Sequence, residues 1–553
     1  MRNYRLHLIF NILFFCCACE NEKSEPVPDP SGHYTDLSLP EKPNILWLVA
    51  EDLSCYLPSF GDSTVQTPNL SRLAAEGICF DNFFAGAPVC APARASIATG
   101  MYPTRIAAGH MRTGGNPLYF PAGIHPYEAM PPSGTRMMSE WLRMHGYYCT
   151  NNAKEDYQFQ KTVTAWDESS RTAHWRNRAE GQPFFAIFNF EVTHESRIWS
   201  KADDPLLVDE DLDVPVPPYL PDNRVGRRDI RRMYSNIIEM DRQVGEILDQ
   251  LEADGLLEET VIFWYSDHGG PLPRQKRLLY DSGLKVPMIV RFPNRQYAGQ
   301  RDDRMASFID LAPAVLSLTG LAPKNYMDGQ DFLGKHQPAE PRKYIHAAAD
   351  RFDGMTDCIR AVRDARYKYI RYYKPDLPMF LHVKYRDQQP IMQELHHLRE
   401  VDSLTEVQKL WFRETKPRFE LFDTKNDPHE INNLGNDPDY SSKIKELSDE
   451  CDRWLAEIND VGLMPETELL EKIWPGGVQP VATAPELTRT ENEMTLSSTT
   501  EGASIGYKII RSESGEPDAW SVYTQPFEIP AGARIKAIAD RIGFQPSEVV
   551  FSE

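Results

Sequence analysis

The chain of 553 residues carries a formal net charge of −21, with 41% hydrophobic and 25% charged residues. This composition is typical of a soluble globular protein and argues against a disordered or membrane-embedded chain. Sequence-independent nucleic-acid binding needs excess Lys and Arg, so the acidic balance argues against nucleic acid as a partner, and an anionic substrate would need a local basic pocket.

Residues 1–19 have the features of an export signal. A basic start is followed by an apolar run too short to span a bilayer, and then by small residues up to Cys19. Cys19 precedes the polar stretch ENEKSEPVPDP and resembles the lipobox cysteine of bacterial lipoproteins. We therefore expect lipidation at Cys19, a tether over residues 20–40, and a place in the bacterial cell envelope, periplasmic or on the outer-membrane surface. Membrane contact would be through the lipid anchor only; plain secretion with cleavage near Ala18 is the alternative.

Residues 41–340 alternate buried-strand and helix patterns. The apolar runs PNILWLVAED, PFFAIFNF and TVIFWYS predict buried strands. Thr67 is predicted to cap a helix that begins at Pro68 and stops at Gly77, and apolar residues at three- and four-residue steps predict a long amphipathic helix over 230–251. This alternation predicts an α/β fold with a large, mostly parallel mixed sheet sandwiched by helices.

The C-terminal part has a different pattern. CIRAVRDARYKYIRYY alternates like an antiparallel strand pair, and we expect a smaller α+β subdomain over residues 341–474. PGGVQPVATAP lies in a linker, residues 475–486. Short strand-like runs separated by turn residues predict a small β-sandwich over 487–553.

Six cysteines lie outside the signal region: Cys55, Cys79, Cys90, Cys149, Cys358 and Cys451. None forms a CxxC pair, which argues against a cysteine-ligated zinc site. One or two disulfides would suit an exported protein, and buried free thiols suit the pattern equally well.

Acidic residues follow the ends of two predicted strands. Glu51 and Asp52 end the first strand, and Asp267 and His268 end a later one. Because carboxylates converging at one sheet edge repel each other unless a cation lies among them, this arrangement indicates a metal site. Oxygen-rich ligation favours Ca²⁺, with Mg²⁺ as the other candidate. The alternative is that each acid caps the helix that follows.

Basic residues follow other predicted elements. Arg94, Lys154 and Lys276 lie after such elements, and His194 follows the strand PFFAIFNF. Cations gathered around a metal would form a pocket for a tetrahedral anion. The alternative is that each of these side chains is solvated at the surface.

Five motifs occur in an order that resembles a known family. CAPAR (90–94) is similar to the CxPxR signature of the type I, formylglycine-dependent sulfatases of the alkaline phosphatase superfamily. ATGMYPTR (98–105), DHGG (267–270), KRLLYDSG (276–283) and ELFDTKNDPHEINNL (420–434) are similar to further motifs of that family. The resemblance runs from about residue 43 to residue 440.

The resemblance implies that Cys90 is oxidised after synthesis to formylglycine, an aldehyde, by a formylglycine-generating maturation enzyme. One hydroxyl of the hydrated aldehyde, polarised by the metal, would attack sulfur and form a covalent sulfo-enzyme. Deprotonation of the second hydroxyl would expel sulfate and restore the aldehyde. The alternative is a buried structural cysteine near a helix start.

The resemblance also assigns roles to the charged residues. It implies that Ca²⁺ is held by Glu51, Asp52, Asp267, His268 and the modified Cys90. Arg94 would support the aldehyde hydrate. Lys154 and Lys276 would bind the sulfate, and His194 would protonate the leaving group.

Three positions depart from the family pattern. Glu51 stands where the family usually has Asp, and its longer side chain would shift the metal slightly. Ala93 replaces the serine of CxPSR, which narrows the maturation systems that would act on Cys90. Asp156 stands where most members have a histidine beside the nucleophile; a carboxylate there would accept a hydrogen bond from the hydrate.

The order of MYSNIIEMDRQVGEILDQLEADG and SDHGGPLPRQKR is most similar to the N-sulfoglucosamine sulfohydrolase branch. The resemblance implies hydrolysis of a sulfate ester or sulfamate on a glycosaminoglycan- or mucin-type glycan. His110 and Arg112 are candidate sugar contacts, with a plain surface loop as the alternative. The C-terminal segment is similar to the small β-sandwich of some hexosaminidases, and we expect it to pack on the catalytic domain, with glycan binding as the alternative.

Two other functions stay open at this point. A phosphoesterase or phosphonate hydrolase on the same fold would keep Cys90 unmodified or use zinc. A glycan-binding lipoprotein without activity would explain the unusual Glu51 and Asp156.

Overall fold

The computed structural model describes residues 34, 36–114, 120–491, 493–511 and 516–552. The predicted export signal and the lipidation of Cys19 lie outside the described residues. Within the described part, no helix combines the length and the apolar character needed to cross a bilayer.

The centre of the molecule is an eight-stranded sheet with strand order β4-β3-β5-β1-β6-β7-β2-β8. Its strands are β1 (Asn44–Ala50), β2 (Ile78–Phe84), β3 (Tyr148–Asn152), β4 (Glu168–Ser169), β5 (Phe184–Phe190), β6 (Thr260–Ser266), β7 (Lys285–Arg291) and β8 (Gln300–Ser307). β7 runs antiparallel to β6 and β2, while the other neighbouring pairs are parallel. The predicted mostly parallel mixed sheet is confirmed.

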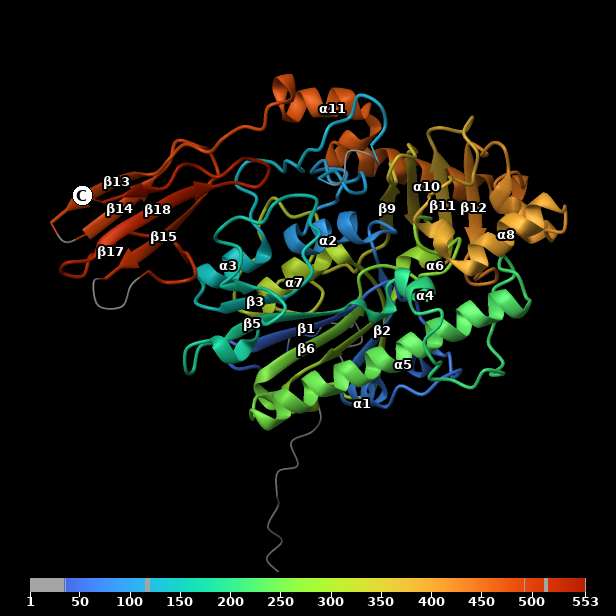
Figure 1. Cartoon of the computed structure of the whole chain (residues 1–553), viewed down its shortest axis with the longest axis horizontal. Coiled ribbons are helices and arrows are strands. Elements are labelled where there is room, and N and C mark those ends of the chain that lie inside the picture. The colour runs from blue at the N-terminus through green and yellow to red at the C-terminus, as the bar shows by residue number, and fades with distance from the viewer. Residues whose placement is uncertain (1–33, 35, 115–119, 492, 512–515, 553) are drawn as a thin grey trace, which may run out of the picture.

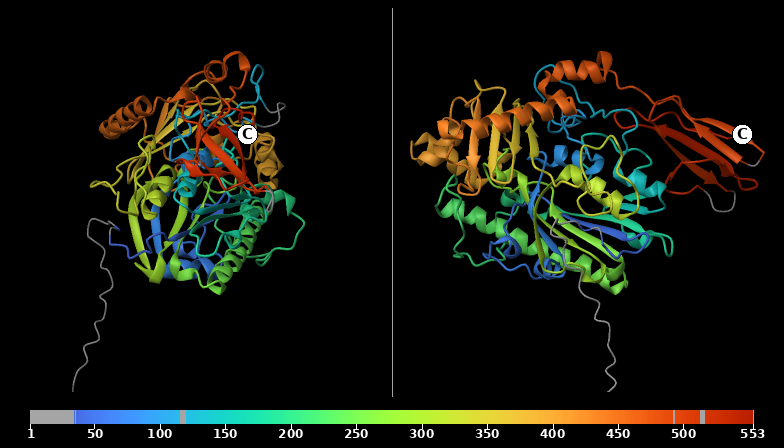
Figure 2. Two further views of the ribbon diagram at one scale, coloured as in Figure 1. Left: turned by 90° about the vertical axis from the view of Figure 1, so that its left-hand side faces the viewer. Right: turned by 180° about the vertical axis from the view of Figure 1, so that it is seen from behind.

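Helices cover both faces of this sheet (Figures 1 and 2). α1 (Pro68–Glu76) and α5 (Arg224–Ala253) lie on one face, and α2 (Cys90–Thr99), α3 (Met138–Met144) and α7 (Leu311–Leu318) lie on the other. Every residue of β1 is buried, as the continuous apolar run predicts for a central strand that is covered on both sides.

The start of α1 differs from the prediction in one respect. Thr67 occupies the N-cap position, but its side chain accepts no hydrogen bond from the helix. The carboxylate of Asp241 in α5 takes this role, accepting hydrogen bonds from the backbone N–H groups of Asn69 (3.2 Å) and Leu70 (2.8 Å). The predicted end of the helix at Gly77 is confirmed.

A second, antiparallel sheet has strand order β12-β11-β10-β9. Its strands are β9 (Ile345–Ala349), β10 (Ile359–Arg363), β11 (Tyr367–Tyr372) and β12 (Phe419–Asp423). β10 and β11 are the antiparallel pair that the alternating pattern predicts. α10 (Ser441–Ile458) packs on this sheet through Cys451 and Trp454.

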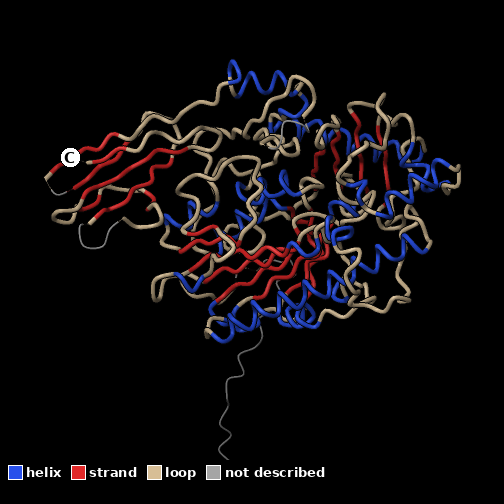
Figure 3. Tube along the Cα trace, viewed as in Figure 1, coloured by secondary structure: helices blue, strands red, loops and turns tan. Residues whose placement is uncertain are grey.

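Two small antiparallel sheets form the C-terminal sandwich, visible in Figure 3 as strands and loops. One contains β13 (Glu486–Thr490), β14 (Glu493–Ser497) and β17 (Phe527–Glu528), and the other contains β15 (Ser504–Ile510), β16 (Ser521–Val522), β18 (Arg534–Asp540) and β19 (Val550–Phe551). The sandwich contacts the region of α3, where Arg143 donates a hydrogen bond to the Trp520 carbonyl (2.7 Å).

The six cysteines of the described residues are all unpaired. The sequence leaves open both disulfides and free thiols, and in the described part of the chain these cysteines are free thiols. Cys55 is half-buried and the other five are buried.

Candidate active site

The carboxyl ends of β1 and β6 bring the first group of polar residues together. The two strands are parallel neighbours, and Ala50 lies opposite Ser266, so the residues after each strand meet at one edge. Nε2 of His268 lies 2.9 Å from Oδ1 of Asp52 and 3.7 Å from Oδ1 of Asp267. One possible ligand atom from each of these three buried residues lies within 4.8 Å of the others.

This donor set fits a divalent cation. Nδ1 of His268 lies 3.0 Å from the Gly269 carbonyl, which only accepts hydrogen bonds, so Nδ1 carries a proton and Nε2 is the ring atom that faces the two carboxylates. Among the described residues Nε2 makes no hydrogen bond of good geometry, although Oδ1 of Asp52 lies 2.9 Å away. Burial lowers the pKa of His268, but Asp267 and Asp52 outweigh it and raise this pKa to about 10. Either a proton or a metal ion must therefore lie between the ring and the carboxylates.

Two glycines hold this edge together and explain parts of two motifs. The backbone N–H of Gly269 donates to the Gly283 carbonyl at 2.9 Å. A Cβ on Gly269 would lie 2.2 Å from the Ser282 carbonyl oxygen, and one on Gly283 would lie 2.3 Å from that of Leu278. The DHGG and KRLLYDSG segments thus need glycine because their backbones touch.

A second group of possible ligands already contains a cation. Ligand atoms of Asp52, His194 and Glu195 also lie within 4.8 Å of one another. Nζ of Lys276 lies 2.8 Å from Asp52, 3.2 Å from Glu195 and 3.3 Å from Nε2 of His194. Because the ammonium neutralises this group, the metal is better assigned to the first one.

Glu51 lies beside bases and outside both groups. Its Oε1 is 2.5 Å from Nζ of Lys154 and 3.3 Å from Nη2 of Arg94. Burial raises the pKa of Glu51, and the two bases oppose that rise. The structure therefore places Glu51 as the counter-ion of Lys154 and Arg94, and its role as a metal ligand stays a prediction.

Helix α2 begins at Cys90 and places Arg94 one turn later. All ten residues of α2 are buried, and no side chain caps its N-terminus. Free backbone N–H groups and the helix dipole favour negative charge at Cys90. Arg94 donates to Oδ2 of Asp267 (3.1 Å) and to Oδ1 of Asn189 (2.7 Å), which ties α2 to the ends of β6 and β5.

Charged side chains surround the buried thiol of Cys90. Burial lowers the pKa of Lys154, but the neighbouring Cys90 and Glu51 raise it above its ordinary value. Burial raises the pKa of Asp156, and Lys154, Arg112 and the adjacent Cys90 lower it further than burial raises it. The residues of the predicted nucleophile position are thus brought together.

His194 follows β5 and meets the same group. Its Nδ1 lies 2.8 Å from Oγ of Ser196, and its Nε2 faces Lys276. Burial and the Lys276 ammonium lower the pKa of His194 to about 3, so the ring is neutral near pH 7.

The two predicted sugar contacts have different surroundings. His110 is buried, and its Nδ1 accepts a hydrogen bond from the Arg351 backbone at 3.3 Å. Arg112 is exposed; desolvation lowers its pKa, and the neighbouring Cys90 and Asp156 raise it above the ordinary value. Of the two, Arg112 is the residue placed to meet a ligand at the site.

Three residues of the site were not among those expected from the sequence. Glu195 forms a two-point ion pair with Arg277 (2.9 and 2.6 Å), and Asn189 accepts from Arg94. Glu195 directly follows His194, and Arg277 directly follows Lys276. These neighbours were the available signal, although adjacency alone does not say which way a side chain points.

Comparison with known proteins identifies the family of the chain. The family described as Sulfatase matches residues 43–180 and 148–321, and N-sulphoglucosamine sulphohydrolase, C-terminal, matches residues 274–410. An ulvan-active sulfatase of Formosa agariphila is 50% identical, covering 99% of this chain and 97% of its own. The N-sulphoglucosamine sulphohydrolase of Homo sapiens is 24% identical over 78% of this chain and 94% of its own. A solved 2-O GAG sulfatase shares the fold, with a TM-score of 0.56 and 17% identity over 76% of this chain and 93% of that one.

Proposed function

Because the chain belongs to the sulfatase family of sulfuric ester hydrolases, we propose that it removes sulfate from an acidic, sulfated polysaccharide of the ulvan kind. The observation that carries the reaction is the set of three cations, Arg94, Lys154 and Lys276, around Cys90 at the uncapped N-terminus of α2. Fixed positive charge in a buried site stabilises the negative oxygens of a sulfuryl group in transfer.

The family implies two groups that the chain's own residues would hold. Asp52, Asp267 and His268 would hold a divalent cation, which supplies Lewis-acid polarisation when bound. Cys90, once oxidised to formylglycine, would supply the attacking hydroxyl. Ca²⁺ is the proposed ion because two of the three donors are carboxylates.

The remaining residues bind the substrate and move a proton. Lys154 and Lys276 both lie near the nucleophile position, since Cys90 raises the pKa of each, and each would donate to a sulfate oxygen. His194 lies 3.3 Å from the Lys276 ammonium and is neutral in the free site. A sulfate group bound beside it would raise the pKa of the imidazole, so the ring would take up a proton with the substrate and deliver it to the leaving oxygen. Asp156 would accept a hydrogen bond from the nucleophile, the part played by histidine in most members of the family.

A basic pocket next to the site supports an anionic polysaccharide. Three bases, Arg171, Arg197 and Lys201, and one acid, Glu191, line this pocket together with Asn189, so the bases are in excess. Asn189 is also the residue that accepts from Arg94, so the pocket adjoins the reaction site. In a chain with a net charge of −21, such a pocket would concentrate an acidic glycan locally.

Sulfate release from ulvan oligosaccharides tests the proposal. We expect the protein made in its native host to release sulfate, and its Cys90 peptide to be lighter by the difference between CH₂SH and CHO. We expect Cys90→Ala to abolish release and Lys276→Ala to lower it by at least about 10²- to 10³-fold per folded molecule, because a cation that stabilises transition-state charge is lost.

Lys416→Ala is the matched control for Lys276→Ala and should leave sulfate release per folded molecule unchanged. Lys416 is also buried and paired with a carboxylate, Asp357 (2.6 Å), and neither residue belongs to a motif of the site. Wild-type turnover by folded Cys90→Ala protein would contradict the mechanism. Sulfate release from glycosaminoglycan disaccharides but not from ulvan would contradict the proposed substrate and would not contradict the proposed mechanism.

A further inference from the structure

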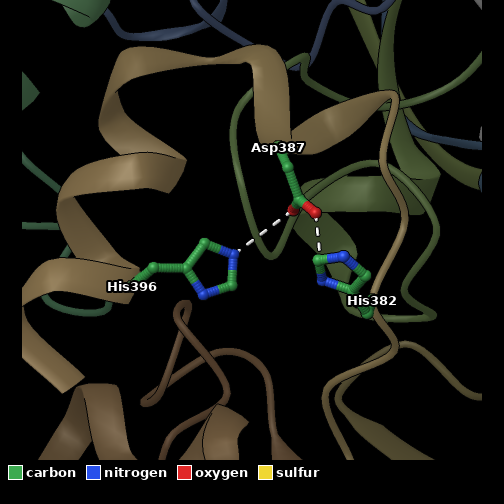
Figure 4. Close-up of side chains that lie close together, drawn as sticks. All are labelled: His382, Asp387 and His396. Carbon is green, nitrogen blue, oxygen red and sulfur yellow. Dashed lines mark hydrogen bonds and ion pairs between the residues drawn. The ribbon is translucent and has the colours of Figure 1, made fainter. Parts of the chain in front are cut away.

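A second cluster of metal-ligating side chains lies outside the candidate active site (Figure 4). Nδ1 of His382 lies 3.1 Å from Oδ2 of Asp387, and Nε2 of His396 lies 3.4 Å from Oδ1 of Asp387. The three residues come from a loop, from the short 3₁₀ helix η8 (Arg386–Gln388) and from α8 (Pro390–Glu400). Figure 4 shows the carboxylate between the two imidazole rings.

We propose that His382, Asp387 and His396 form a second metal site, which takes a transition-metal ion such as Zn²⁺. Two imidazoles and one carboxylate are donors that suit Zn²⁺, whereas Ca²⁺ favours a donor set with more carboxylate oxygens, such as the one that contains Asp52 and Asp267. Bonds of about 2.0–2.1 Å in a tetrahedron place neighbouring ligand atoms roughly 3.3 Å apart. The two imidazole nitrogens lie 3.1 and 3.4 Å from different oxygens of the Asp387 carboxylate, and one ligand atom from each residue lies within 4.8 Å of the others. A small movement of the exposed His382 ring would bring the three donors to the spacing of a bound ion.

Aromatic residues outside the cluster hold one of its rings in place. The His396 ring packs on Phe380 and Phe412, with ring centroids 5.3 and 6.3 Å apart. Oδ2 of Asp387 is buried and has no hydrogen-bond partner of good geometry among the described residues. A buried carboxylate oxygen left in this state costs free energy, and a metal ion would remove that cost.

His382 leaves one side of the site open. Its side chain is 61% exposed, so a fourth ligand would come from solvent. Three protein ligands and one open position are the usual arrangement of a zinc ion that is not fully enclosed. The exposed ring also means that removing it disturbs little of the core.

The proposed metal would hold the loop that borders the active site. Tyr385 lies between His382 and Asp387 in the sequence, and its ring centroid is 6.2 Å from that of His194 and 5.1 Å from that of Trp199. A metal that joins the chain on both sides of Tyr385 would fix this ring beside the imidazole proposed to protonate the leaving group. The metal site itself stands without that proposed role.

Zinc binding by the full chain tests the site. Zn²⁺ is titrated in the presence of saturating Ca²⁺, which occupies the candidate metal site at Asp52. Wild type and the single variants share that site, so any Zn²⁺ that binds there contributes equally to both and drops out of the comparison. We expect His382→Gln and His396→Gln each to weaken one Zn²⁺ site by more than about 100-fold. His397→Gln is the matched control because His397 is the next residue of α8, is exposed and lies outside the cluster. We expect it to bind Zn²⁺ like wild type.

Backbone hydrogen exchange of residues 382–388 gives a second readout. We expect Zn²⁺ to slow exchange there in wild type and in His397→Gln, and to leave it unchanged in His382→Gln. Equal Zn²⁺ affinity and stoichiometry in wild type and His382→Gln would overturn the proposal. Because His382 is exposed, a folding defect would not obscure that result.

Discussion

At the level of single residues, Asp52 joins the two halves of the active site. Its carboxylate contacts His268 on the side of the candidate metal donors and Lys276 on the side of the lysines proposed to bind sulfate. Burial raises the pKa of Asp52, but Lys276, His194 and His268 together hold it well below its ordinary value. A cation on the His268 side would compete with Lys276 for the negative charge of the Asp52 carboxylate. The N–H groups of the Lys276 ammonium would then be free to donate to an anionic substrate.

Glu195 is the residue on which the positions of the two adjacent bases depend. It pairs with Arg277 at 2.6 Å and with Lys276 at 3.2 Å, all three buried. We expect Glu195→Gln to lower the free energy of unfolding by about 3–5 kcal/mol, because a neutral amide leaves the buried guanidinium uncompensated. Urea unfolding measures this loss.

The control for Glu195→Gln is Glu191→Gln, four residues earlier. Glu191 is exposed and lies 3.9 Å from Arg197, so we expect its replacement to change stability by no more than about 0.5 kcal/mol. If both variants lost a similar free energy of unfolding, the buried ion pair of Glu195 and Arg277 would contribute no more to stability than the exposed pair of Glu191 and Arg197.

Residue positions at strand ends could be predicted, but side-chain directions could not. Asp52, Asp267 and His268 follow apolar runs that read as buried strands, and parallel strands bring their carboxyl ends to one edge. Glu51 has the same position in the sequence pattern, yet its carboxylate pairs with Lys154. Which base a carboxylate meets depends on a loop folded from another part of the chain.

At the level of whole elements, α1 and α5 depend on each other. Asp241 of α5 accepts two backbone hydrogen bonds at the start of α1, a role that the local sequence assigns to Thr67. Local capping patterns predict where α1 begins and ends, because Pro68 and Gly77 act through their own backbones. They cannot identify a cap supplied by a distant helix.

We expect Asp241→Ala to destabilise the protein by about 1–2 kcal/mol, the usual cost of losing an N-terminal helix cap. The backbone N–H groups of Asn69 and Leu70 would lose their acceptor. Thr67→Ala should cost less than about 1 kcal/mol, because the Thr67 hydroxyl has no hydrogen-bond partner in the described structure. Thermal unfolding of the two variants side by side checks the order; a larger loss for Thr67→Ala would return the capping role to that residue.

At the level of the whole molecule, the C-terminal sandwich is attached to the catalytic part through buried polar contacts. Glu140 of α3 accepts a hydrogen bond from Oγ of Ser504 (2.7 Å), and Arg136 donates to the same hydroxyl (3.0 Å). Asp540 of β18 accepts from the backbone N–H of Val163 (2.9 Å). These contacts support the expectation that the sandwich packs on the catalytic part.

Asp540 makes this attachment sensitive to pH. Burial raises its pKa from 3.8 to about 7, the Val163 N–H opposes the rise, and the nearby acids Glu140 and Glu128 add to it. Because the folded-state pKa is the higher one, the neutral carboxyl stabilises the folded protein fully below about pH 4, and this stability is lost as pH rises to about 7. The loss amounts to about 1.4 kcal/mol per pH unit over that range.

Asp540→Asn removes the ionisation and keeps an oxygen that can accept from Val163. We therefore expect the variant to be more stable than wild type by a margin that grows from pH 5 to pH 7 and is constant above about pH 8. Thermal unfolding at a series of pH values measures the margin. Asp518→Asn, at an exposed position of the same sandwich, is the control and should show a margin independent of pH in this range. A margin for Asp540→Asn that stays flat between pH 5 and pH 7 would mean that the carboxylate is already ionised in the folded protein, and that the attachment of the sandwich does not depend on its proton.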